Sequence, residues 1–272
     1  MIDKKVALVT GVSSGIGRAT AVLLLDRGFR TFGTMRELSR ANGLPPGLEL
    51  IRLDVRDRES VRSCVQTVLD QSGRIDSLVN NAGYTLVGAL EETSIEEAKE
   101  IFETNFFGVL RMCRAILPIM RSQKQGRIVN ISSVLGFLPA PYQGLYAATK
   151  HALEAYSESL DHEVREFGIR VSAVEPGFTR TSIGQNARVA KDTLEVYVAE
   201  RERVIDALQK SLAHGADPTT VARVVLDALT SQSPRLRYPA GREARLLNRL
   251  NRLAPAKMID RGLRKQFGLK IA

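Results

Sequence analysis

The sequence predicts an α/β protein with one doubly wound parallel sheet in a single domain. Three observations predict it: short apolar runs without an in/out alternation, helical periodicity in the gaps between them, and a glycine-rich turn after the first run. The chain has 272 residues, 44% hydrophobic and 25% charged, which is enough for one substantial core. Disordered, collagen-like and small disulfide-rich classes are therefore excluded.

The predicted elements alternate along the chain. The first apolar run, residues 6–9, is a strand; the glycine-rich turn follows it, and a helix over 19–25 ends before Gly28. Further strands are predicted over 30–34, 48–53, 75–79, 127–131 and 169–174, and further helices over 58–72, 94–121, 145–167 and 217–231. This alternation gives βαβ crossovers, so we expect helices on both faces of the sheet.

Residues 182–216 interrupt the alternation with helical periodicity alone. We expect one domain over 1–240, with 182–216 as a helical insertion near the carboxyl edge of the sheet, where open α/β sheets bind their ligands. Residues 241–272 are expected to form a basic, amphipathic, helical C-terminal extension.

Cysteine and histidine spacing gives no sign of a metal site or a disulfide framework. Cys64 and Cys113 are far apart, and no His-x-x-His or similar pattern occurs. The sequence also has neither a signal-peptide pattern at Met1 nor a run of about 20 apolar residues. We expect a cytoplasmic protein without a metal.

The glycine-rich turn has the spacing T-G-x-x-x-G-x-G between a buried strand and a helix. Glycine lets backbone N–H groups approach a pyrophosphate, and the helix N-terminus adds a partial positive charge. The alternative is a turn selected only for packing. The residues of the turn expected to bind a dinucleotide are Thr10, Gly11, Ser13, Ser14, Gly15, Ile16 and Gly17.

At this point the chain resembles the short-chain dehydrogenase/reductase family. The resemblance covers the chain to about residue 240 and rests on further motifs in the family's order: Asn80-Asn81-Ala82-Gly83, Asn105, Ser133, Tyr146-x-x-x-Lys150 and Pro176-Gly177. It implies a Rossmann-fold oxidoreductase that transfers a hydride between a nicotinamide and a carbonyl or alcohol carbon. A non-catalytic dinucleotide sensor or scaffold on the same fold is the second hypothesis.

Tyr146 and Lys150 are four residues apart in a predicted helix, so their side chains share one face. A neighbouring ammonium favours the phenolate, which makes Tyr146 the candidate general acid/base. The resemblance implies that Lys150 also binds the nicotinamide ribose, that Ser133 orients the reacting oxygen and that Asn105 completes a proton relay. Ser132 is the competitor of Ser133; we prefer Ser133, thirteen residues before the tyrosine, as in the family.

The end of the second strand bears on the choice of cofactor. An acidic residue there would bind the ribose 2′-hydroxyl of NAD, whereas an arginine accommodates the 2′-phosphate of NADP. The family's acidic position corresponds to Met35 and its basic position to Arg36, which favours NADP(H). Glu37 is the counter-argument for NAD(H), since a shift of one residue would offer a carboxylate to the ribose.

The resemblance implies the remaining cofactor contacts. Asp54 and Val55 match the family's adenine contacts, and Asn81, Ala82 and Gly83 match its wall along the adenosine ribose. The loop expected to hold the nicotinamide carboxamide consists of Pro176, Gly177, Thr179 and Thr181. Thr181 is the better match by spacing, and either threonine is alternatively a helix N-cap for the insertion.

The C-terminal segment carries the whole excess of positive charge. The net charge is +9, and residues 235–272 hold eleven Lys/Arg against Glu243 and Asp260. Arg242, Arg245, Arg249 and Arg252 lie among Leu246, Leu247, Leu250 and Leu253 at helical spacing. Such a helix can contact a membrane surface or an acidic partner. The favoured alternative is a helix packed on the domain or over the substrate cleft, with no nucleic-acid binding.

The substrate is expected to be a small hydrophobic carbonyl compound or alcohol. The candidate lining residues are apolar or aromatic, namely Leu135, Phe137, Leu138, Tyr142 and Phe178; the alternative is that they belong to the ordinary core or to an interface. The insertion and the tail loosely resemble the 17beta-hydroxysteroid dehydrogenase-like and retinol dehydrogenase-like branch of the family. The resemblance also implies a homodimer or homotetramer through residues 94–121 and 145–167.

Overall fold

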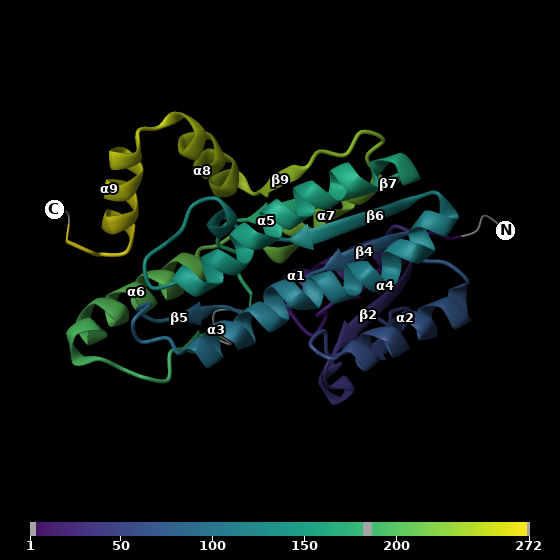
Figure 1. Cartoon of the computed structure of the whole chain (residues 1–272), viewed down its shortest axis with the longest axis horizontal. Coiled ribbons are helices and arrows are strands. Elements are labelled where there is room, and N and C mark those ends of the chain that lie inside the picture. Colours follow the sequence, from purple (N-terminus) through teal and green to yellow (C-terminus); the bar gives the residue numbers. More distant parts are fainter. Residues whose placement is uncertain (1–3, 182–186, 271–272) are drawn as a thin grey trace.

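The computed structural model describes residues 4–181 and 187–270 and confirms the doubly wound parallel sheet (Figure 1). Residues 182–186, the start of the predicted insertion, and the terminal residues 1–3 and 271–272 lie outside the described residues. Seven parallel strands are ordered β3-β2-β1-β4-β6-β7-β9. Their bounds are β1 Val6–Thr10, β2 Arg30–Met35, β3 Glu49–Arg52, β4 Ser77–Asn80, β6 Gly126–Ile131, β7 Ile169–Pro176 and β9 Arg237–Ala240.

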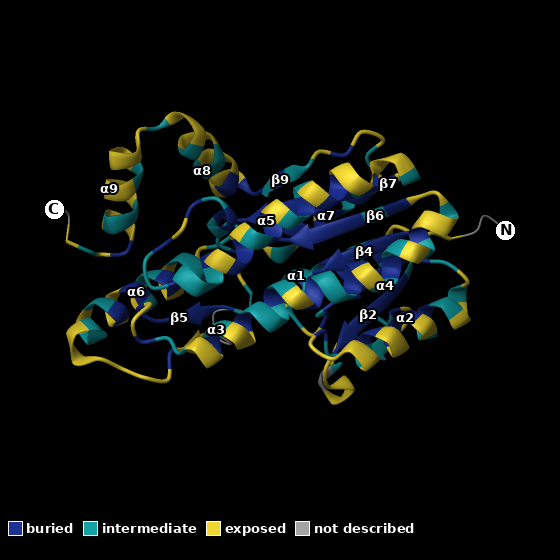
Figure 2. Cartoon of the chain, in the orientation of Figure 1, coloured by how far each residue is buried: buried dark blue, intermediate teal, exposed yellow. Residues whose placement is uncertain are grey.

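Helices cover both faces of this sheet. One face packs on α1 Gly15–Asp26 and α7 Pro218–Thr230, and the other on α2 Arg58–Ser72, α4 Gly108–Gln123 and α5 Gly144–Val164. Each face has its own apolar core. Leu8 belongs to the core under α2, α4 and α5, and its neighbours Ala7 and Val9 belong to the core under α1 and α7. Figure 2 shows the central strands dark blue, because both of their faces are buried.

Two parts of the main fold differ from the sequence prediction. Strand β9 was not predicted, because Arg237-Tyr238-Pro239-Ala240 is short, charged and contains a proline, which sheets accept at their edges. The single helix expected over 94–121 is divided into α3 Ile95–Phe102, a π-helical turn η2 Glu103–Phe107, and α4. Short 3₁₀ turns complete this part of the chain at Leu38–Arg40, Val134–Gly136 and Arg165–Phe167.

The inserted and C-terminal segments lie beyond the carboxyl edge of the sheet. Within the insertion, β8 Arg188–Val189 pairs with β5 Leu86–Val87, and α6 Glu195–Ala213 follows. The extension forms α8 Arg242–Leu253 and α9 Ala256–Gln266, which project from the body at the upper left of Figure 1. No helix in residues 4–181 and 187–270 has both the length and the apolar character needed to cross a bilayer.

A buried carboxylate joins α5 to β7. Asp161 is fully buried, and its carboxylate accepts hydrogen bonds from Arg170 Nε and from the Val171 backbone N–H, both at 2.8 Å. Arg165 donates to the same carboxylate. Burial alone would raise the pKa of Asp161, but the hydrogen bonds from Arg170 and Arg165 outweigh it and hold the pKa below its usual range. Asp161 is therefore ionised and bound to both elements.

Replacing Asp161 with Asn should lower the free energy of unfolding by about 3 kcal/mol, because two arginines lose a buried counter-charge; both are partly exposed, which places the loss at the low end for a buried pair. Urea denaturation measures it. Glu59→Gln, which breaks an exposed pair with Arg62, is the control and should leave stability nearly unchanged. Equal effects of the two substitutions would contradict this account.

Candidate active site

Two adjoining cavities lie at the carboxyl ends of the strands. The first, here the glycine cleft, has a volume of about 400 Å³ and lies at the ends of β1 to β4. The second, here the tyrosine pocket, has a volume of about 420 Å³ and lies between β6, β7, α5 and α6. The two cavities are continuous, since they share the lining residues Ile16, Asn81, Gly83, Tyr84 and Thr181.

The glycine turn forms the floor of the glycine cleft. Gly11 and Gly15 have φ angles of +73° and +59°, a left-handed conformation that glycine adopts without strain. A Cβ atom at Gly17 would lie 2.3 Å from Gly11 O, so only glycine lets the helix start so close to the turn. Ser14 does not cap α1 with its side chain, and the first turn contains no acidic residue. This helix N-terminus therefore suits an anionic phosphate group.

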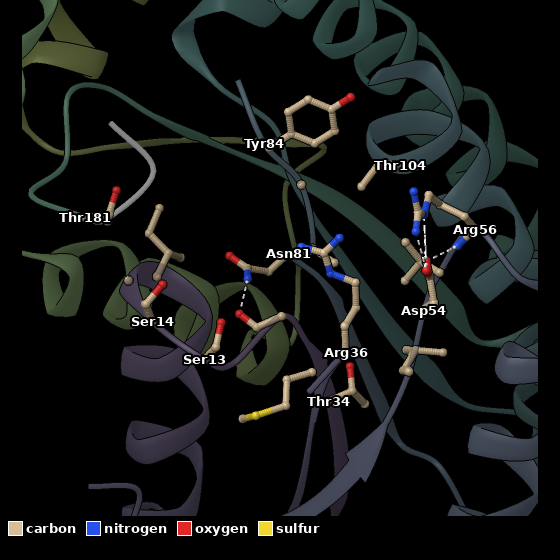
Figure 3. A pocket seen from close by; sticks show the side chains of 18 of the residues that line it. Ser13, Ser14, Thr34, Arg36, Asp54, Arg56, Asn81, Tyr84, Thr104 and Thr181 are labelled. Carbon is tan, nitrogen blue, oxygen red and sulfur yellow. Dashed lines mark hydrogen bonds and ion pairs between the residues drawn. The ribbon is translucent and has the colours of Figure 1, made fainter. Parts of the chain in front are cut away.

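Asn81 ties the loop after β4 to the turn after β1. Its Nδ2 donates to Thr10 O at 2.9 Å and to Gly11 O at 3.0 Å. Thr10 Oγ1 in return accepts from the backbone N–H groups of Asn81 and Ala82. Figure 3 shows Asn81 at the centre of the cleft wall. The predicted residues of both loops are thus brought together, and Gly83 continues the wall into the tyrosine pocket.

Arg36 lines the far end of the glycine cleft, whereas Glu37 is not among the described residues that line it. Asp54 and Val55, the predicted adenine contacts, line the same end. The sequence analysis missed Arg56, whose Nη2 lies 2.6 Å from Asp54 Oδ2 (Figure 3). The hydrogen bond from Arg56 lowers the pKa of Asp54, and the charge of Arg36 lowers it further, against the effect of burial. This end of the cleft therefore presents an ionised carboxylate and two guanidinium groups.

Ser133, Tyr146 and Lys150 meet in the tyrosine pocket. Lys150 Nζ is buried, donates a hydrogen bond to Ile131 O at 2.7 Å and lies 5.6 Å from the centre of the Tyr146 ring. Burial lowers the pKa of Lys150 to about 8, partly opposed by the negative charge of Glu154 one helical turn later. Lys150 is thus largely an ammonium at neutral pH.

The pKa of Tyr146 differs from the expectation that a neighbouring ammonium would favour the phenolate. Burial raises its pKa to about 12, and a hydrogen bond with Ser133 lowers it only in part. Burial, and not the charge of Lys150, decides the pKa of Tyr146 in this structure. At neutral pH Tyr146 is a phenol and therefore a proton donor.

The two candidate serines have different neighbours. Ser133 starts the 3₁₀ turn Val134–Gly136, and its Oγ accepts from the Leu135 N–H at 3.1 Å while the side chain also bonds Tyr146. Ser132 is buried, and its backbone N–H donates to Val174 O at 2.8 Å. Ser133 is therefore the serine in contact with the tyrosine.

Asn105 lies in the π-helical turn, where the helix widens. Its Nδ2 donates to Tyr84 O at 2.9 Å and to Thr149 Oγ1 at 3.3 Å, and its Oδ1 accepts from the Tyr84 N–H at 3.0 Å. Asn105 thus connects the loop after β4 to α5, where its partner Thr149 directly precedes Lys150. It does not line the described part of the tyrosine pocket, and its role in a proton relay stays a prediction.

The loop after β7 closes the pocket on the other side. Pro176, Gly177, Thr179 and Thr181 all line it. The alternative reading of Thr179 as an N-cap is wrong, because α6 begins after Leu194 and Thr179 Oγ1 donates to Gly177 O at 3.1 Å. Thr181 packs on the glycine turn, since its Cβ would lie 3.0 Å from a Cβ at Gly15.

The apolar wall of the tyrosine pocket is only partly the one predicted. Leu135 and Phe178 line it, whereas Phe137, Leu138 and Tyr142 are not among its described lining residues. Most of the wall comes from segments far away in sequence, and sequence analysis missed it because only tertiary packing brings them here: Val87, Val189, Ile205, Leu208, Leu212 and Phe267. Leu208 and Leu212 lie in the segment 182–216, whose periodicity predicted a helix. That periodicity did not indicate which surface the helix packs against.

Curated proteins similar to this chain are oxidoreductases. The chain is 37% identical over 242 residues to a 3-ketodihydrosphingosine reductase of Bacteroides thetaiotaomicron, covering 88% of this chain and 89% of that protein. It is 35% identical to retinol dehydrogenase 8 of Bos taurus, covering 86% of this chain and 80% of the relative.

Solved structures agree with this. A short-chain dehydrogenase from Streptomyces avermitilis superposes with a TM-score of 0.82 at 37% identity, covering 93% of this chain and 94% of the other. A relative from Burkholderia phymatum, solved in complex with NAD, gives a TM-score of 0.79 at 26% identity, with coverage of 99% and 97%. The family model for short chain dehydrogenases matches residues 5–192. The chain therefore belongs to the short-chain dehydrogenase/reductase family of oxidoreductases.

Proposed function

We propose that this protein is an NADP(H)-dependent oxidoreductase that interconverts a carbonyl and an alcohol on a hydrophobic substrate. The observation that carries the proposal is the meeting of Ser133, Tyr146 and Lys150 in a pocket continuous with the glycine cleft. A dinucleotide sensor would need the cleft but not a serine and a tyrosine beside a buried lysine in the adjoining pocket.

The chain's own residues supply proton transfer and positioning. A bound nicotinamide dinucleotide would supply or accept the hydride. In reduction, Tyr146 Oη gives its proton to the carbonyl oxygen, and Ser133 Oγ donates a hydrogen bond to the same oxygen. In oxidation, the alcohol proton returns to Tyr146. Lys150 provides the ammonium that stabilises the phenolate left after proton transfer, and Asn105 holds the adjoining loop.

The glycine cleft fits NADP(H) better than NAD(H). Its floor is the uncapped N-terminus of α1, which suits the pyrophosphate, and Arg36 with Arg56 lines the end where an adenosine 2′-phosphate would lie. Glu37 is the residue that would favour NAD(H), and it is not among the described lining residues.

Three supporting features concern the substrate and the assembly. The tyrosine pocket is walled by aliphatic and aromatic side chains, and the relatives named above are a ketosphingoid reductase and a retinol dehydrogenase. The proposal extends to a cytoplasmic location and to self-association through α4 and α5; Phe107, the residue before α4, is an exposed aromatic residue beside these helices.

Tyr146→Phe should reduce turnover by about 1,000-fold, because it removes the proton donor, and should leave NADPH binding intact. The assay follows NADPH consumption with a panel of hydrophobic ketones and aldehydes. Tyr156→Phe is the matched control on the same helix, since its hydroxyl faces Cys113 and not the pocket. Retention of most activity by Tyr146→Phe would refute the assignment.

Arg36→Ala should weaken NADPH binding by about 10- to 100-fold and leave NADH binding unchanged, because only the 2′-phosphate loses a charged hydrogen bond. Titrations read by nicotinamide fluorescence suit this chain, which contains no tryptophan. Glu37→Gln is the companion variant. Tighter binding of NADH than NADPH by the unaltered protein, lost in Glu37→Gln, would make Glu37 the ribose ligand.

Reduction should slow as the pH rises past about 8, where the buried ammonium of Lys150 loses its proton. Tyr146, with a pKa of about 12, stays protonated over this range and does not cause the decline. A pH profile of kcat/KM for a reduced carbonyl substrate checks this. A rate that stays level to about pH 10 would show that Lys150 does not act as a cation.

A further inference from the structure

We propose that α8 and α9 dock this protein on an anionic lipid bilayer. Their inner side is held on the body beside the tyrosine pocket, whose wall includes Phe267 directly after α9. Their outer side combines exposed leucines with arginines. The docking itself is independent of the proposed function; its purpose, to take a hydrophobic substrate from the bilayer, rests on that function.

The inner side fixes the helix pair on the body of the protein. On α8, Asn248 Nδ2 donates to Glu175 Oε2 at the end of β7 (3.3 Å), and Asn251 Nδ2 donates to Phe137 O (3.2 Å). After α9, Phe267 is buried against Val204 and Leu208 of α6 and lines the tyrosine pocket. The orientation of the outer side is therefore set by contacts beside the site.

The outer side carries an unusual concentration of exposed apolar residues. Leu246, Leu250 and Leu253 follow one face of α8 with relative exposures of 57%, 39% and 84%, and Met258 of α9 is 54% exposed. Figure 2 shows these two helices largely yellow, apart from their contacts with the body. Leu253 has the highest exposure among the large hydrophobic residues in the described part of the chain.

Cations surround this apolar face. Residues 242–270 contain nine Lys/Arg and only two acids, Glu243 and Asp260. The carboxylate of Glu243 accepts a hydrogen bond from the Phe178 N–H, so it is engaged with the loop after β7. Arg242, Arg245, Arg249 and Arg252 are all exposed on α8. The face is thus both apolar and strongly positive.

This combination selects a bilayer over other occupants. Leucines beside arginines on one helix are typical of helices that lie in a membrane interface, where the leucines enter the acyl boundary and the cations meet lipid phosphates. A second copy of this chain would bring two positive faces together, which charge repulsion opposes. A nucleic acid would satisfy the arginines but leave the leucines in water.

Co-sedimentation of the full chain with vesicles tests the proposal. Vesicles of phosphatidylcholine with phosphatidylglycerol should bind the protein at least ten-fold more tightly than phosphatidylcholine alone. About 1 M salt, where the Debye length is about 3 Å, should abolish that difference. Arg249→Gln should weaken binding about five-fold, the value of one cation at such a surface. Arg58→Gln, at an arginine on α2 that is also exposed, is the matched control and should bind normally.

The apolar contribution is tested with Leu253→Glu and Leu246→Glu. Each should lower vesicle binding at least ten-fold with an unchanged Tm, because both side chains are exposed in the free protein. Val196→Glu, at an exposed position on α6, should have no effect. Binding unaffected by these leucine variants, or a shift from dimer to monomer in Leu253→Glu without loss of vesicle binding, would overturn the proposal.

The two proposals can fail separately. Vesicle binding needs no substrate, so it tests docking even if no turnover is found. Conversely, an active protein that binds no anionic vesicles would refute docking and leave the oxidoreductase assignment intact.

Discussion

The site depends on one geometric constraint: all seven strands of the main sheet run parallel, so their carboxyl ends meet at one edge. Thr10 ends β1, and Arg36, Asp54 and Asn81 follow the next strands of that half of the sheet. Ser133 and Gly177 follow β6 and β7 in the other half. Residues spread over more than 160 positions of sequence therefore form two continuous cavities. The strand ends position them, and no long loop is needed to bring them together.

Two close approaches make that edge usable. The N-terminus of α1 lies against Gly11 because position 17 has no side chain, and Asn81 then bonds both Thr10 O and Gly11 O. On the other side, Asn105 bonds the backbone of Tyr84 from a π-helical turn, where the helix hydrogen bonds span five residues instead of four. These hydrogen bonds fix the backbone on both sides of the wall that the two cavities share. The polar groups of the tyrosine pocket are therefore held in a fixed position relative to the glycine cleft.

The sequence predicts those parts of the fold and of the candidate site that depend on residues close together in the chain. Strand ends, the glycine turn and the Tyr146-Lys150 spacing depend on neighbours a few residues away, and the structure brings the residues they mark together. β9 and the apolar wall depend on packing between distant segments, so Tyr238 in a strand and Phe267 in a pocket have no local signal. The pKa of Tyr146 also has no local signal, because burial sets it and the spacing of residues in the sequence does not reveal burial.

The edge strand β9 has a consequence for how this protein behaves at high concentration. A parallel sheet with an open edge can add strands from other molecules, which is the first step toward aggregates. Pro239 in the middle of β9 lacks the N–H that a further strand would need, and α8 begins two residues after the strand ends. The sheet is thereby closed to growth at this edge, so the protein can expose the leucines of α8 nearby without also offering an open strand edge beside them.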